Sequence, residues 1–351
     1  MKKSLQIFSM GSAHMARKTT ASDVARLAGV SASTVDRVLN NRGGVTEARE
    51  KAVLAAARQL GLDRALNQRA ARTLRIAVMT QPPSNPFHAA IQRGFEQANR
   101  SYPQFNMQFR LHHIDPARGG QTARRITGLA ANHDGIVIVS AYDADIAAAL
   151  SVFTEAGKPV ITLATDMPGL ESHRYIGPDN YSAGRLAGTL MGRFLGREGG
   201  AVMAIAGMFN MVGQQERVSG FQAVLRERHP ACHMEAVQES LEQGERAGEL
   251  VYQALRRNPS LRGVYNASAG AQPVVEALKA LGRQDVVFIT HELTPEYRSL
   301  LKAGLIDAII DQDPVQEVRT AVETLGAHFG RAEQPPASLI TPVHIHLIEN
   351  C

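Results

Sequence analysis

The chain has 351 residues, of which 44% are hydrophobic and 20% charged, a composition typical of globular proteins. This length exceeds what one hydrophobic core usually covers, so two or three domains are expected. The two cysteines, Cys232 and Cys351, cannot staple a fold and are expected to be free thiols in a cytoplasmic protein. No segment approaches the run of about 18 apolar residues that a membrane-spanning helix needs.

The formal net charge of +5 is too small to indicate an anionic partner by itself, but its distribution is uneven. Between residues 15 and 75, Arg and Lys outnumber Asp and Glu by more than two to one, whereas the remainder is slightly acidic. In residues 1–18, Gln6 and Ser9 interrupt an apolar run that is too short for a secretory signal. A disordered leader or tag is expected there, either a cloning remnant around GSAHM or a segment that precedes a true start at Met15.

Residues 19–62 predict three short helices with a glycine turn between the first two. Thr20 or Ser22 can cap the first helix, Gly29 permits a sharp turn, and Ser31 can cap the second helix, which runs from about residue 32 to 40. The third helix follows Thr46. The first and third helices each have an apolar stripe, formed by Val24, Leu27 and Ala28 and by Val53, Leu54, Ala57 and Leu60. This is the pattern of a helix-turn-helix unit.

The second helix divides into two faces at 100° per residue. Val35, Val38 and Leu39 lie on one side and are expected to pack on the other helices. The opposite arc carries Ser33, Asp36, Arg37 and Asn40. Arg37 can bind guanine or a phosphate, and Asn40 can bind adenine or the backbone of DNA.

The stretch TASDVARLAGVSASTVDRVLNNRGGVTEAREKAVLAAARQLG resembles the headpiece of the LacI-type repressors, whose core reads D-V-A-x-x-A-G-V-S-x-x-T-V-S-R-V-L-N. The resemblance implies that this headpiece binds operator DNA and precedes a hinge and a two-lobed sensor. Ala32, Ser33 and Arg37 then occupy base-reading positions, and Thr34 and Asn40 hold phosphates or the adjacent backbone. The whole set of predicted DNA-binding residues is Thr20, Ala32, Ser33, Thr34, Asp36, Arg37, Asn40, Arg69 and Arg72.

Asp36 departs from the family, which has Ser at this position. Its carboxylate can accept a hydrogen bond from the amino group of a cytosine, or fix the guanidinium of a nearby arginine such as Arg42. Alternatively, it lies at the rim of the helix and weakens nonspecific phosphate binding. All three roles are compatible with the sequence.

Residues 63–74 predict a hinge or linker. The family's hinge reads Y-x-P-N-x-x-A-R-x-L, and its leucine inserts into the minor groove. An ungapped alignment places Ala71 at that leucine. Either Leu74 takes this role after a shift in register, or the protein bends its operator less and relies on Arg69 and Arg72.

From residue 75 onward, candidate strands alternate with amphipathic helical stretches such as 89–100, 146–156 and 274–281. The strands are expected at 75–79, 107–114, 135–139, 159–164, 201–207, 234–239, 263–267, 285–290 and 307–311. This alternation predicts an α/β fold, a two-lobed doubly wound sensor like the type I periplasmic binding proteins, over residues 75–351. Ligand is expected at the carboxyl ends of the strands.

Polar and aromatic residues that follow these strand ends are the predicted effector site. They resemble the ligand positions of the sugar-binding proteins, which implies a small sugar or polyol effector. The set is Asn85, Phe87, His88, Asp166, Arg217, Asn266, Glu292 and Gln312. His88 stands where a second aromatic is frequent, and His291 with Glu292 where Phe-Asp or Tyr-Asp is usual, so the particular ligand differs.

We see no G-x-S-x-G nucleophile elbow and no P-loop, so neither an enzyme nor a cofactor is expected. His344 and His346 share one strand face, but two histidines do not make a metal site, and a solvated face is expected. The resemblance implies a repressor that binds a pseudo-palindromic operator in double-stranded DNA as a homodimer. The alternative is a solute-binding protein of a sugar transport system.

Overall fold

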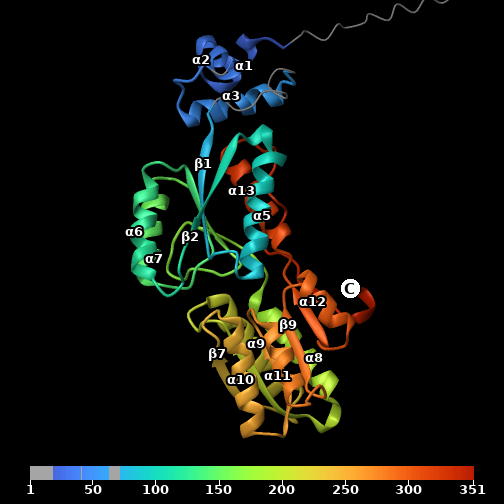
Figure 1. The fold of residues 1–351 in the computed structure, drawn as a ribbon. Coiled ribbons are helices and arrows are strands. Elements are labelled where there is room, and N and C mark those ends of the chain that lie inside the picture. The colour runs from blue at the N-terminus through green and yellow to red at the C-terminus, as the bar shows by residue number, and fades with distance from the viewer. Residues whose placement is uncertain (1–18, 41, 63–71) are drawn as a thin grey trace, which may run out of the picture. The chain divides into compact units, whose positions relative to one another are not determined.

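The computed structural model describes residues 19–40, 42–62 and 72–351 (Figure 1). The chain forms two compact units, with the boundary between Arg72 and Thr73. The predicted leader and Arg69 of the predicted hinge lie outside the described residues.

The first unit has three helices, α1 (Ala21–Ala28), α2 (Ala32–Leu39) and α3 (Glu47–Gln59). Thr20 forms a capping box with Asp23, and Gly29 ends α1 with a φ of 65°, which only a residue without Cβ adopts easily. Apolar side chains from all three helices form one core: Val24, Ala25, Val35, Val38, Leu39, Val53, Leu54, Ala56 and Ala57. The prediction for Leu27 was wrong. This side chain is 47% exposed, because the core covers the side of α1 that carries Val24 and Ala25.

The second unit contains two lobes. The first lobe has a parallel sheet in the order β2-β1-β3-β4-β5. Its strands are β1 (Leu74–Thr80), β2 (Met107–His113), β3 (Gly135–Ile138), β4 (Val160–Leu163) and β5 (Arg174–Ile176). One face packs on α5 (Pro86–Ser101) and α13 (Pro314–His328), and the other on α6 (Gly119–Ala130) and α7 (Ala144–Glu155). The sequence did not predict β5, which has three residues.

The second lobe has a sheet in the order β11-β10-β9-β8-β6-β7, parallel except for β11. Its strands are β6 (Gly200–Ala206), β7 (Cys232–Glu239), β8 (Leu261–Asn266), β9 (Val287–His291), β10 (Ala308–Asp311) and β11 (His344–His346). One face packs on α8 (Asn180–Leu195) and α9 (Val212–Arg228). The other packs on α10 (Gly244–Arg257), α11 (Ala271–Ala280) and α12 (Pro295–Lys302). Short 3₁₀ turns occur at Pro103–Phe105, Gly196–Glu198 and Ile348–Asn350.

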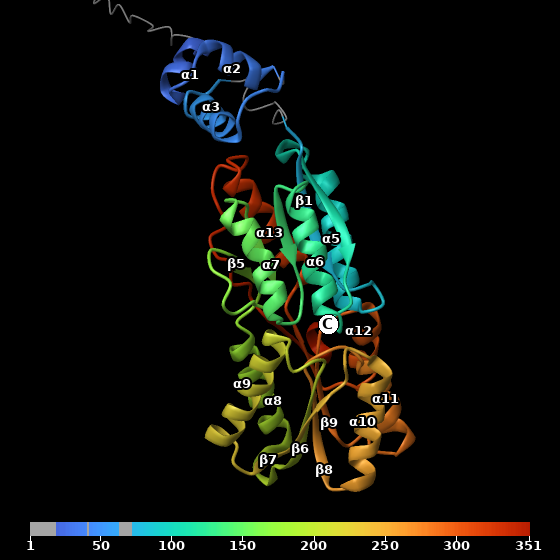
Figure 2. The ribbon, with the colours of Figure 1, turned by 90° about the vertical axis from the view of Figure 1, so that its left-hand side faces the viewer.

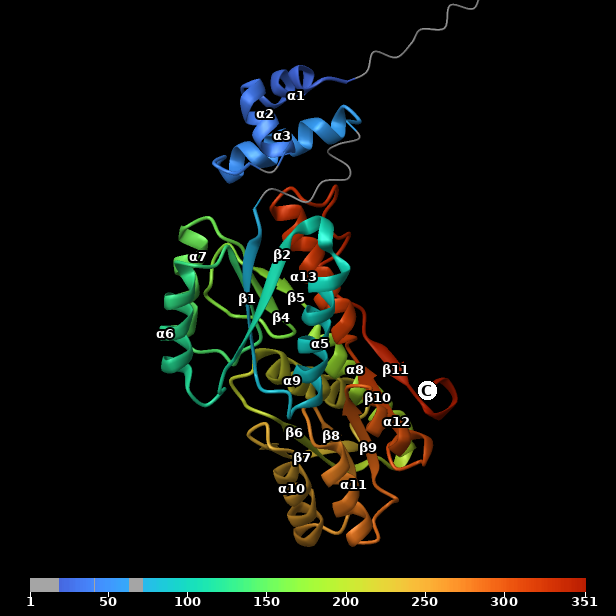
Figure 3. The same ribbon diagram turned by 45° about the horizontal axis from the view of Figure 1, so that its top comes forward.

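The chain passes between the lobes after β5, after β10 and before β11 (Figures 2 and 3). Two of these passages are joined, because Gly177 donates to the carbonyl of Leu339 and accepts from the amide of Thr341. At the third passage Asp313 has a φ of 54° and caps α13. The predicted α/β fold with two doubly wound lobes and a helical N-terminal unit is therefore confirmed.

Candidate DNA interface and effector cavity

The outward face of α2 presents Ala32, Ser33 and Arg37 to solvent, while Val35 and Val38 are buried. Nη1 of Arg37 lies 3.5 Å from the place that a Cβ on Gly44 would take, so the loop after α2 leaves room for the guanidinium. An exposed short helix with Ser and Arg on its free face has the shape and chemistry to enter a major groove.

Asp36 connects two neighbours on this face. Its Oδ2 accepts from Nη1 of Arg42 at 3.0 Å, and its Oδ1 accepts from Nδ2 of Asn40 at 2.5 Å. Of the contacts expected for Asp36, the structure shows the hydrogen bond with Arg42, and the role of either residue on DNA stays a prediction. One N–H of the Asn40 amide is used by Asp36, which leaves the other N–H and the carbonyl oxygen for DNA.

The other predicted DNA contacts in the first unit already have partners. Thr20 donates to Asp23 at 2.6 Å, and Thr34 shares a hydrogen bond of 2.9 Å with Ser31. Arg72 lies 4.0 Å from the carboxylate of Glu47. Since these groups are exposed or half-buried, their contact with DNA stays a prediction.

A cavity lies between the two lobes at the carboxyl ends of their strands. Six predicted effector residues line it: Asn85, Phe87, His88, Arg217, Glu292 and Gln312. The cavity also has lining residues that the sequence analysis did not select: Pro86, Val139, Ala164, Thr165, Met211, Gly213, Gln214, Glu242, Ala267, Ser268, Ala269, His291 and Tyr297. Most of these follow strand ends, so the position after a strand end contained the signal. Glu242 was missed although the predicted end of its strand, residue 239, is the observed end of β7.

Arg217, in the second turn of α9, is the central cation of the cavity. It is buried, and its Nε donates to Asn180 at 2.7 Å. Its Nη2 donates to Gln312 at 2.9 Å, and its Nη1 to the carbonyl of Ala267 at 3.4 Å. The planar guanidinium is thereby held in one pose.

Two carboxyl groups line the cavity. Glu242 accepts from Gln214 at 2.6 Å and from Asn85 at 3.1 Å, so this side chain joins the two lobes. Glu292 accepts from Nε2 of Gln312. Burial, aided by the Asp311 carboxylate, raises the pKa of Glu292 to about 8. Burial also raises the pKa of Glu242.

Two histidines line the cavity, and both are neutral near pH 7. Burial lowers the pKa of His88 to about 3, and its Nδ1 lies 2.6 Å from the hydroxyl of Thr80. Burial lowers the pKa of His291 well below its usual value, and Nε2 of His291 lies 2.7 Å from the hydroxyl of Tyr265. These rings therefore offer single donors or acceptors to a ligand rather than positive charge.

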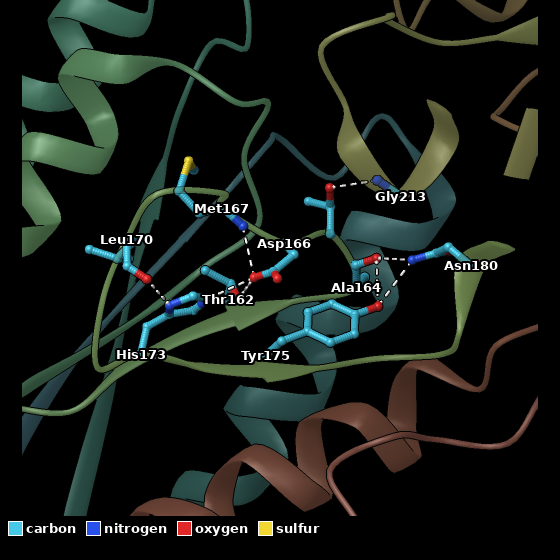
Figure 4. A network of polar contacts seen from close by, with 10 residues as sticks. Thr162, Ala164, Asp166, Met167, Leu170, His173, Tyr175, Asn180 and Gly213 are labelled. Atoms are coloured by element: carbon cyan, nitrogen blue, oxygen red, sulfur yellow. Dashed lines mark hydrogen bonds and ion pairs between the residues drawn. The ribbon is translucent and has the colours of Figure 1, made fainter. Parts of the chain in front are cut away.

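The structure places Asp166 outside the cavity, contrary to the prediction. Its carboxylate accepts from Thr162 and Met167 and lies 2.7 Å from Nε2 of His173 (Figure 4). The hydrogen bond with His173 lowers the pKa of Asp166 and raises the pKa of His173. This pairing could not be predicted from the sequence, because His173 is seven residues away along an irregular loop.

Asn266 also lies outside the cavity lining. Its side chain is buried and bonds the loop that follows β8, donating to Ala269 at 3.1 Å and accepting from Ser268 at 3.3 Å. Its observed contacts thus shape the loop that brings Ser268 and Ala269 to the cavity, rather than the cavity surface itself.

The described ranges contain no group of three or more His, Cys, Asp or Glu side chains that could hold a metal ion. The rings of His344 and His346 lie 6.5 Å apart between centroids. Within the same ranges, no helix is long and apolar enough to cross a membrane.

Each of the two units matches a known protein family. Residues 20–63 match the family of bacterial regulatory proteins named for lacI, and residues 76–332 match the periplasmic binding protein domain. The maltose regulon regulatory protein MalI of Escherichia coli is 32% identical over 279 residues, covering 77% of this chain and 78% of that protein. The ribose import binding protein RbsB of the same organism is 24% identical over 254 residues, which cover 71% of this chain and 82% of RbsB.

Solved structures resemble the sensor. A solute-binding protein of Burkholderia graminis in complex with D-arabinose has a TM-score of 0.72 and 23% identity, covering 81% of this chain and 98% of that one. A glucose-galactose binding protein of Geobacillus stearothermophilus has a TM-score of 0.70 and 22% identity, covering 80% and 99%. The chain therefore belongs to the lacI family of bacterial regulatory proteins and is a DNA-binding transcriptional regulator with a periplasmic-binding-protein-like sensor.

Proposed function

We propose that this regulator is a cytoplasmic repressor that binds a two-fold symmetric operator as a homodimer and is controlled by a sugar or polyol. The observation that carries the proposal is the cavity around Arg217, where amide, guanidinium and carboxyl groups from both lobes converge beside the ring of Phe87. Vicinal hydroxyls pair with such groups, and an apolar ring covers the C–H face of a sugar.

Control follows from the lobe geometry. A ligand held by Asn85 and His88 of the first lobe and by Arg217 and Glu292 of the second stabilises one angle between the lobes. It changes DNA affinity only to the extent that it binds the two states of the sensor with different affinity. Two headpieces are needed because one short helix contacts too few base pairs to select a site.

The alternative of a solute-binding protein explains the likeness to RbsB but not the match of residues 20–63 to the regulators.

We further propose that the protein binds its effector without turnover. Consumption of a bound ligand by the purified protein would contradict this.

The test has two stages. Genomic fragments selected on the full-length protein identify the operator, and footprinting then shows whether the half-sites have two-fold symmetry. Sugars and polyols are next screened for release of that operator and for thermal stabilisation, which is about 2.7 kcal/mol at 100 times the dissociation constant. A selected site without symmetry contradicts the dimer. A broad panel without any effect on either measurement contradicts the sugar or polyol effector.

A further inference from the structure

We propose that the effector cavity selects a sugar acid, a polyhydroxylated carboxylate, over the corresponding neutral sugar. This inference rests on the proposed function, because it names the class of effector for the same cavity. It depends on an excess of hydrogen-bond donors and on a buried cation without a carboxylate partner.

The cation is Arg217. Its guanidinium has five N–H groups, and the structure shows three of them bonded to neutral oxygens, those of Asn180, Gln312 and Ala267. Among the ion pairs of the described residues, none joins Arg217 to a carboxylate. A buried charge is costly unless it is paired, so a ligand anion beside Arg217 gains an electrostatic term that a neutral sugar lacks.

His291 supplies a donor. The hydroxyl of Tyr265 is fully buried, and the hydrogen bond described for it joins Nε2 of His291 at 2.7 Å. The phenol must donate in this contact to avoid a buried, unbonded proton, so we assign the ring proton of His291 to Nδ1. That atom is buried and has no hydrogen-bond partner among the described residues, and its ring lines the cavity.

Tyr297 supplies a second donor. Its hydroxyl oxygen accepts from the amides of Gly270 and Ala271, both at 3.2 Å, at the N-terminal end of α11. Both lone pairs of that oxygen are then occupied, so the hydroxyl proton is the group that remains for a ligand in the cavity that Tyr297 lines.

The two carboxyl groups offset these donors only in part. Each oxygen of Glu242 already accepts one hydrogen bond, from Gln214 or from Asn85, and keeps one lone pair. In Glu292, Oε1 accepts from Gln312, while Oε2 is buried without a described partner. With a pKa of about 8, Glu292 is protonated at pH 7, and Oε2 then acts as a donor.

The charged groups around Glu292 favour this protonated form in sum. The carboxylate of Asp311 on β10 disfavours ionisation of Glu292, whereas Arg217 on α9 favours it. Burial and the neighbouring Glu292 raise the pKa of Glu317 on α13 well above its usual value, so Glu317 adds no negative charge there near pH 7. Burial makes the largest contribution. The first turn of α9 also lies at the cavity, since Met211 and Gly213 line it. The hydroxyl of Thr165 accepts from the amide of Gly213 at 3.1 Å, so the helix contributes the positive end of its dipole rather than a free amide at this residue.

The first experiment measures binding of matched pairs to the full-length protein by calorimetry at pH 7. The pairs are D-galactose with D-galacturonate and D-glucose with D-gluconate. We expect the acid of at least one pair to bind at least tenfold more tightly than its neutral partner. Tighter binding of the neutral members overturns this inference and leaves the sugar or polyol proposal intact. Binding of neither, together with a failed screen for sugars and polyols, overturns both.

The second experiment follows the affinity for the best acid from pH 6 to 9.5. Binding of an anion beside protonated Glu292 is expected to weaken about tenfold per pH unit above pH 8, and Glu292→Gln is expected to flatten the profile. Affinity that rises with pH, or a profile that Glu292→Gln does not change, overturns the inference. Tyr297→Phe is expected to lower the affinity for the acid about tenfold. Tyr252→Phe is the matched control, because Tyr252 is exposed on α10, and it is expected to leave that affinity unchanged.

Discussion

Arg42 donates to the carboxylate of Asp36 across a separation of six residues, from the loop after α2 back to the helix itself. Both side chains are substantially exposed, so the pair contributes little to the stability of the headpiece. The pair instead determines where the guanidinium of Arg42 lies, which is beside the face of α2 that also carries Arg37.

Replacing Asp36 with Ser, the residue usual in this family, is expected to release Arg42 and Asn40 for phosphate contact. Binding to all DNA sequences then becomes tighter, and the plot of log affinity against log salt becomes steeper by about 0.9 per new ionic contact. Filter binding to operator and to random DNA over a salt series measures both. Combining Asp36→Ser with Arg42→Ala is expected to cancel the increases in affinity and in salt slope, because the released cation is then absent. A changed base preference without a change in slope would instead show that Asp36 contacts a base.

Removing the side chain of Arg37 is expected to reduce discrimination between operator and random DNA by about 1–3 kcal/mol, the contribution of one bidentate contact to a base. Salt-dependent binding remains, because other cations of the headpiece are unchanged. Competition binding at fixed salt measures the discrimination. Arg226→Ala is the matched control, since it removes the same charge from an exposed position on α9 of the sensor. Unchanged discrimination in Arg37→Ala would contradict the assigned role.

The Asp166–His173 pair predicts a pH dependence of sensor stability. The pKa of His173 is raised, so its contribution is full below the unfolded value of about 6.5 and disappears as pH rises through the folded value. The pKa of Asp166 is lowered, so its contribution disappears only in acid, as pH falls through the folded value. His173→Gln is therefore expected to lower the melting temperature most at pH 5–6 and least above pH 9. A loss that is equal at all pH values would contradict the charge pairing.

Close packing of α8 on α9 predicts that a single methyl group at Gly184 disturbs the effector site. A Cβ there would lie 1.9 Å from the carbonyl oxygen of Arg217, so the helices must separate. Gly184→Ala is expected to cost about 1–3 kcal/mol of stability and to weaken effector binding, because Arg217 moves with α9. Denaturant unfolding and calorimetry measure the two effects.

Gly128 provides the control for that substitution. It lies in α6, and a Cβ there would meet nothing within 4 Å. Gly128→Ala is therefore expected to stabilise the sensor by about 0.5–1 kcal/mol and to leave ligand affinity unchanged. If Gly184→Ala behaves like Gly128→Ala, the packing of α8 on α9 does not position Arg217.

The sequence predicted features that depend on local periodicity. The three headpiece helices and the alternation of strands and helices follow from apolar spacing. The grouping of six site residues around one cavity was expected from strand ends together with the resemblance to the sugar-binding proteins. Contacts set by irregular loops were not predictable in this way. Asp166 has the sequence position of a ligand group, yet its partner His173 is brought close by a loop, and Asn266 turns toward its own loop.

Gln312 occupies the last position of the second lobe before the chain enters α13, which packs in the first lobe. Its amide bonds Arg217 and Glu292, and the next residue, Asp313, has the left-handed backbone of the passage between lobes. A rotation of one lobe against the other therefore changes the backbone at Gln312 and Asp313, and with it the direction of the Gln312 side chain. The side-chain amide that contacts the cavity groups is thus directly coupled to the backbone between the lobes. A more flexible backbone at Asp313 is therefore expected to weaken both ligand binding and the effect of the ligand on DNA binding.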